Sequence, residues 1–174
     1  MKALFFFILI GMTPGLMSAQ VGLPENWLGS WQGELVIYDA QGERQRLPME
    51  LYIQPQDSSF TWHIIYGADK TAGLRAYLLR SVDTAKGHFV IDEQNGILLD
   101  AFLLGGQLIS RFEVMGSLLQ SRVEVVGDTL YYEIIYGGWD AIRQSGDTVM
   151  DGDSIPPVQS FLIQGRQYAV LKRG

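Results

Sequence analysis

The 174-residue chain contains no cysteine. Disulfides, thiolate metal sites, cysteine nucleophiles and a lipidated N-terminal cysteine are therefore excluded. Basic residues are also scarce, because 13 Lys and Arg stand against 19 Asp and Glu and give a net charge of −6. Such an acidic chain is a poor partner for nucleic acid or for anionic lipid headgroups.

The apolar run at residues 3–10 is too short to span a membrane, which takes about 20 residues. It follows Met1-Lys2 and precedes Ser18-Ala19, and this order is typical of a secretory signal peptide. We expect cleavage after Ala19, which leaves residues 20–174 as a single β-barrel domain with no integral membrane span. The mature protein would be periplasmic or secreted. An uncleaved anchor is the alternative interpretation.

Helical periodicity is missing from the rest of the chain, where apolar and polar residues alternate with period two. Residues 31–38 and 47–54 show this alternation clearly, and turn sequences recur about every ten residues. Asn95-Gly96 is the strongest short-range hairpin signal. The pattern predicts an all-β fold, an antiparallel up-and-down β-barrel of nine to eleven strands.

Residues 138–157 interrupt this rhythm. We expect one or two helical turns over residues 139–144, and a last hairpin that pairs residues 160–163 with 167–172. The segment is either a lid or binding loop, or a plain crossover. Its acids partly match a calcium loop, but Val158 stands where a bidentate Glu is needed. A solvated acidic loop is therefore preferred, and no metal ligand is assigned.

Charge alternation suggests a register for the hairpin around Gly116. A four-residue connection over residues 116–119 would place Arg111 opposite Glu124 on the outer face of the sheet. We expect this longer loop, with the charges forming a solvated ladder.

The opening of the first predicted strand, Leu28-Gly29-Ser30-Trp31-Gln32-Gly33, resembles that of the calycin superfamily, which includes lipocalins and nitrobindin-like β-barrels. The resemblance implies that Trp31, beside Gly29, closes the barrel floor. It also implies that a basic residue late in the chain packs across this tryptophan. Arg173 is best placed for that role, with Arg166 and Lys172 as alternatives.

Two departures from the family pattern limit what carries over. The Thr-Asp-Tyr turn of lipocalins is missing from this chain. Nitrobindin-like proteins bind haem through a histidine near the C-terminus, whereas this chain has only His63 and His88. No cofactor is therefore expected.

Aromatic side chains at alternating positions suggest a small hydrophobic or amphiphilic ligand inside the barrel, with Arg75 and Tyr77 as its polar handle. The predicted ligand-binding residues are Trp62, Tyr66, Arg75, Tyr77, Tyr132 and Tyr136. The same aromatics could instead fill the core of a barrel that acts through protein–protein contacts.

No sequence motif of a hydrolase, a metalloprotease or a phosphate-binding loop is present. No catalytic residue is assigned. An enzyme built on the barrel mouth would need His63 or Asp100 to point inward, and we expect Asp100 to face outward. The histidines could join a carboxylate in a metal site, but one surface and one core or rim histidine is preferred.

Overall fold

The computed structural model describes residues 22–174, so the predicted signal peptide lies outside the described residues. The elements are η1 (Glu25–Trp27), β1 (Gly29–Asp39), β2 (Gly42–Ile53), β3 (Pro55–Gln56), β4 (Ser59–Tyr66), β5 (Leu74–Asp83), η2 (Thr84–Lys86), β6 (His88–Asp92), β7 (Leu98–Leu104), β8 (Gln107–Val114), β9 (Ser117–Val126), β10 (Thr129–Gly138), β11 (Ala141–Ser145), β12 (Thr148–Met150), β13 (Asp153–Ile155), β14 (Val158–Phe161) and β15 (Gly165–Arg173). No helix within this range is long and apolar enough to cross a bilayer.

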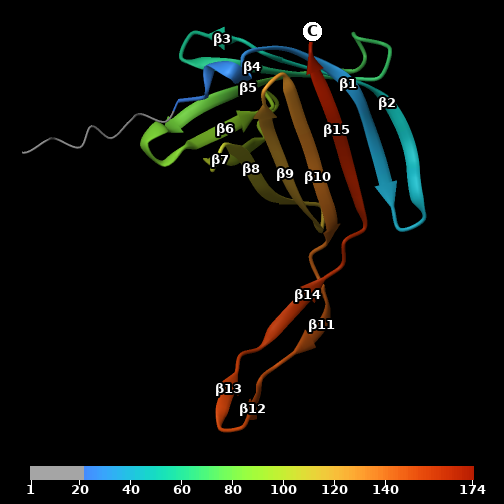
Figure 1. Ribbon diagram of the computed structural model, residues 1–174, viewed down its shortest axis with the longest axis vertical. Coiled ribbons are helices and arrows are strands. Elements are labelled where there is room, and N and C mark those ends of the chain that lie inside the picture. The colour runs from blue at the N-terminus through green and yellow to red at the C-terminus, as the bar shows by residue number, and fades with distance from the viewer. Residues whose placement is uncertain (1–21) are drawn as a thin grey trace, which may run out of the picture.

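Ten strands form one closed antiparallel barrel (Figure 1). Around the barrel their order is β2, β1, β15, β10, β9, β8, β7, β6, β5 and β4, and a β2–β4 pairing closes the ring. Barrel strands that follow one another in the chain are neighbours in the sheet, and the last strand, β15, pairs with both β10 and the first strand, β1. This confirms the prediction of an all-β, up-and-down antiparallel barrel.

Alternation along each strand decides which side chains enter the barrel. In β1, Trp31 and Leu35 are buried while Glu34 between them is not. In β2, Met49 and Leu51 are fully buried and flank Glu50, which remains partly exposed. Because side chains on a strand point to opposite faces in turn, this pattern places one apolar row from each strand in a common core.

A short seam between β2 and β4 closes the barrel. Residues Met49–Tyr52 pair with His63–Tyr66, and no residue of β2 before Met49 pairs with β4. Pro48 stands at this limit, where its missing N–H removes one possible ladder hydrogen bond. Residues 42–47 of β2 therefore pair with β1 alone and form a sheet edge.

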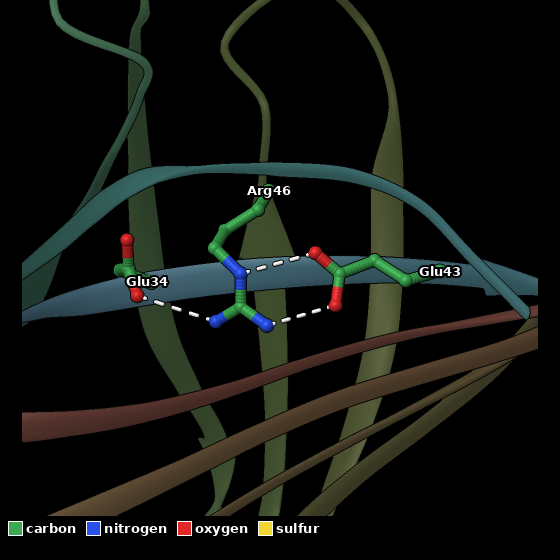
Figure 2. Close-up of polar contacts among 3 residues, drawn as sticks. All are labelled: Glu34, Glu43 and Arg46. Atoms are coloured by element: carbon green, nitrogen blue, oxygen red, sulfur yellow. Dashed lines mark hydrogen bonds and ion pairs between the residues drawn. The ribbon is translucent and has the colours of Figure 1, made fainter.

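Charged side chains cover this edge. A β-bulge at Arg44 places Glu43 and Arg46 on the same outer face. Figure 2 shows Arg46 Nε and Nη2 donating to the two carboxylate oxygens of Glu43 at 3.1 and 2.8 Å, and Nη1 donating to Glu34 at 3.2 Å. The Arg46 guanidinium lowers the pKa of the Glu43 carboxyl. Charges on an edge strand deter pairing with another chain.

Residues 139–163 form an arm that projects from the barrel (Figure 1). In it β11 pairs with β14, and β12 pairs with β13. The expected helical turns at 139–144 and the expected pairing of 160–163 with 167–172 are therefore wrong. Asp151 and Gly152 have φ values of 52° and 90°, the conformation of a two-residue hairpin turn. Asp-Gly favours this turn, which makes the acidic segment a hairpin tip.

The expected long loop around Gly116 is also wrong. Met115 and Gly116 form a two-residue turn with φ values of 51° and 79°, and Arg111 lies opposite Gln120. Arg122 of β9 instead forms an ion pair with Glu133 of the neighbouring strand β10, at 3.1 Å.

Candidate functional site

A tryptophan–arginine stack lies at one end of the barrel. Trp31 is fully buried, and Arg173 Cζ lies 4.3 Å from the centre of its ring. The guanidinium also donates to the backbone oxygens of Asn26 and Leu28, at 2.7 Å each. Trp31 Nε1 donates to Trp27 O at 2.9 Å. These contacts tie the first strand, the last strand and η1 into one floor.

Glycine is favoured at position 29 by this stack. It has a φ of +136°, and a Cβ there would lie 2.6 Å from Arg173 Nη1. The Gly-x-Trp spacing therefore leaves room for the arginine that covers Trp31. Gly33 lies two residues after Trp31, against Leu171 and the Val170 carbonyl of β15. Because it has no side chain, β1 and β15 can approach each other closely.

A cavity of about 150 Å³ lies inside the barrel. Its lining is formed by Trp62, Ile64, Tyr66, Tyr77, Ile91, Glu93, Leu99, Ala101, Leu108, Ser110, Phe112, Ser121, Val123, Tyr132 and Ile134. All of these residues lie on β4–β10 or directly follow β6, and β1, β2 and β15 contribute none. The inward side chains of those three strands pack into the core and leave the cavity on one side of the interior.

A pair of tyrosine hydroxyls spans the barrel beside the cavity. Tyr66 comes from β4 and Tyr132 from β10, and their hydroxyl oxygens lie 3.1 Å apart. One hydroxyl donates to the other, so the accepting tyrosine keeps its own O–H free to donate. Burial raises the pKa of both phenols, that of Tyr132 most strongly. Both side chains therefore remain neutral donors at physiological pH.

Tyr77 and Glu93 mark the mouth of the cavity. Both side chains are half-buried, and they lie near the ends of β5 and β6 that are opposite the Trp31 floor. Burial is the main cause that raises the pKa of Tyr77, and the charge of Glu93 adds to it. The Glu93 carboxylate is the one charged group in the cavity lining.

The six predicted ligand-binding residues do not all meet. Trp62, Tyr66, Tyr77 and Tyr132 line the cavity, whereas Arg75 and Tyr136 do not.

Arg75 lies at the rim, where its long side chain can reach solvent. Although it is opposite Ile64 in the ladder, its guanidinium is exposed and donates to the backbone oxygens of Ala72 and Leu74 at 3.2 and 3.0 Å. The Tyr136 ring instead lies over Gly165 of β15, whose missing side chain makes the space for it.

Sequence reasoning missed the small and acidic members of the lining. Ser110 and Ser121 lie on the inward face of β8 and β9, as the alternation of those strands indicates. Ser110 donates to Asp100 O at 2.7 Å, so its hydroxyl is already satisfied. Glu93 follows the last residue of β6, where period two no longer decides the direction of a side chain.

The two histidines do not enter the cavity. His88 Nε2 lies 2.7 Å from Asp100 Oδ1, its ring stacks on Phe102, and Asp100 is exposed. The prediction that Asp100 faces outward is therefore confirmed. His63 is also absent from the cavity lining. Among residues 22–174, no cluster of three His, Cys, Asp or Glu side chains has the geometry of a metal site.

No family model matches the chain, and no curated protein matches it either.

Replacing Gly29 with alanine tests the floor. We expect Gly29→Ala to lower the free energy of unfolding by about 1–3 kcal/mol, because alanine is strained at this φ and its Cβ displaces Arg173. Urea unfolding would measure the change. Gly22→Ala is the matched control, since a Cβ there has no neighbour within 4 Å. Equal effects of the two substitutions would contradict the assigned role of Gly29.

Alkaline pH tests the buried hydroxyl pair. Because the pKa of Tyr132 is raised from 10.0 in the folded protein, the unfolded chain loses this proton first as pH rises. Stability is therefore intact below about pH 10 and falls above it, by about 1.4 kcal/mol per pH unit for each such tyrosine. We expect Tyr132→Phe to make this fall shallower by that amount.

Urea unfolding at a series of alkaline pH values measures the slope. Tyr38→Phe is the control, because Tyr38 lies on the outer surface beside Arg46. A Tyr132→Phe slope equal to that of the wild type would show that the phenol is not buried as described.

Proposed function

We propose that the protein is an exported, lipocalin-like binding protein that holds a small hydrophobic or amphiphilic ligand inside the barrel. The cavity is the observation that carries this proposal. It has an apolar wall with a few convergent hydroxyl groups, which is the usual composition of a small-molecule site. Its volume of about 150 Å³ is many times the space that one water needs, about 10–15 Å³. Export is inferred from the N-terminal residues alone.

The floor supports a relationship to the calycin superfamily. An arginine from the last strand covers a tryptophan from the first, and glycine at position 29 makes room for it. This is the arrangement that the resemblance of the opening motif implies. The fold by itself does not determine the ligand.

The proposed ligand site can be tested by filling it. Ser121 faces the cavity from β9, so Ser121→Phe would occupy the space that the ligand uses. Gln120→Phe adds the same ring to the outer face of the same strand, where Gln120 is exposed, and serves as the control.

We expect isothermal titration with 1-octanol to show binding to the wild type and to Gln120→Phe, but not to Ser121→Phe. Native mass spectrometry of the purified wild type would identify any molecule that it already carries. Equal octanol binding by all three proteins would place the ligand outside the cavity and contradict the proposal.

The projecting arm favours a second candidate function, binding to another protein. Its large apolar side chains are exposed: Ile142 by 63%, Val149 by 69% and Ile163 by 68%. An isolated two-stranded hairpin is only marginally stable in water, and exposed apolar residues of this kind are typical of contact surfaces.

Shortening the arm tests this function. We expect replacement of residues 145–158 by Asn-Gly to leave the free energy of unfolding within about 0.5 kcal/mol of the wild type, because these residues lie outside the barrel. Octanol binding should also be unchanged. Chemical crosslinking in the native envelope should yield complexes with the wild type and none with the shortened protein. If the shortened protein formed the same complexes, the arm would not be the surface that binds the other protein.

A further inference from the structure

We propose that the cavity takes an uncharged molecule, of the size of a single ring or a short chain, through one hydrogen-bonding group, and that it excludes carboxylates. This inference rests on the proposed ligand-binding function and adds the size, polarity and charge of the ligand.

The volume of the cavity limits the size of the ligand. Pockets for drug-sized ligands have volumes of about 300–1,000 Å³, whereas an apolar cavity of about 150 Å³ is known to accept benzene. The cavity here is of the second kind, at about 150 Å³. The packed half of the barrel and the Tyr66–Tyr132 pair prevent a longer chain from extending across the interior.

The tyrosine pair determines the polar group of the ligand. Of its two O–H groups one is used between the rings, and the other is free to donate. Of the two serines in the lining, Ser110 already donates to Asp100 O, which leaves the hydroxyl of Ser121 as a further partner for the ligand. A hydroxyl or carbonyl oxygen on the ligand would accept the remaining tyrosine proton. An unpaired polar group left in such a site costs free energy, so a purely apolar ligand gains less.

The charges around the cavity exclude an anionic ligand. The lining contains no Lys, Arg or His, and its one charged member is the carboxylate of Glu93. Arg75, the nearest candidate for a cationic handle, directs its guanidinium to the backbone oxygens of Ala72 and Leu74. A bound carboxylate would therefore lose its hydration and face the carboxylate of Glu93, and no cation of the lining would compensate for this.

Four ligands that share a benzene ring test the effects of the polar group and of charge separately: toluene, benzaldehyde, benzyl alcohol and benzoate. We expect titration calorimetry on the full-length mature protein to show binding of benzyl alcohol and benzaldehyde. Toluene should bind more weakly than either. Benzoate should bind at least about tenfold more weakly than benzyl alcohol, a difference of about 1.4 kcal/mol.

Two variants assign these differences to residues. Tyr66→Phe combined with Tyr132→Phe replaces both partners of one hydrogen bond by apolar groups of the same shape, which has little effect on folding. It should reduce the advantage of benzyl alcohol over toluene several-fold. Glu93→Gln should raise the affinity for benzoate several-fold relative to the affinity for benzyl alcohol. Asp57→Asn removes an equal charge from the exposed turn between β3 and β4, and should change neither affinity.

The outcomes separate this inference from the function on which it rests. Benzoate binding as tight as that of benzyl alcohol, or no effect of Glu93→Gln, would overturn the exclusion of carboxylates and leave the ligand-binding function intact. Binding of decanol but of no ring compound, abolished by Ser121→Phe, would overturn the size limit alone. Absence of binding for every compound, octanol and decanol included, would overturn both.

Discussion

Four residue pairs between β2 and β4 close the barrel, and the enclosed interior depends on them. Pro48 limits the seam on one side, and the ion pair between Lys70 and Glu50, at 2.7 Å, lies on its outer face. If this seam opened, the sheet would have two free edges and the cavity would become an exposed groove. Free edges invite pairing with other chains, so closure protects both solubility and the internal site.

The two ends of the barrel differ in structure. The floor is sealed by contacts that join the first and last strands, and Arg173 lies over Trp31 there. The opposite end carries Tyr77 and Glu93 at the mouth of the cavity, and it is also where the arm leaves β10 and returns to β15. A ligand entering at the mouth and a protein bound to the arm would therefore meet at the same end of the molecule.

The sequence predicts the architecture well because period two assigns each side chain to a face, and Asn95-Gly96 marks a turn without ambiguity. The same rule placed four aromatic residues in the cavity. It failed for Arg75, because alternation gives the face of a strand but not whether a long side chain at the rim bends toward solvent. The arm was missed although Asp151-Gly152 is the same kind of turn signal. Its acids resembled a calcium loop, and its exposed strands have no buried face to reveal them.

The position of β15 has a consequence for how the chain folds. This strand is the last of the barrel in chain order, yet it must fit between β10 and the first strand. The hairpins between consecutive strands can form locally, but β1 lacks one of its two neighbours until residues 165–173 pair with it. Contacts of such long sequence separation make folding slow, since the entropy of a large loop is lost before they form. The barrel therefore cannot close before its final strand is in place.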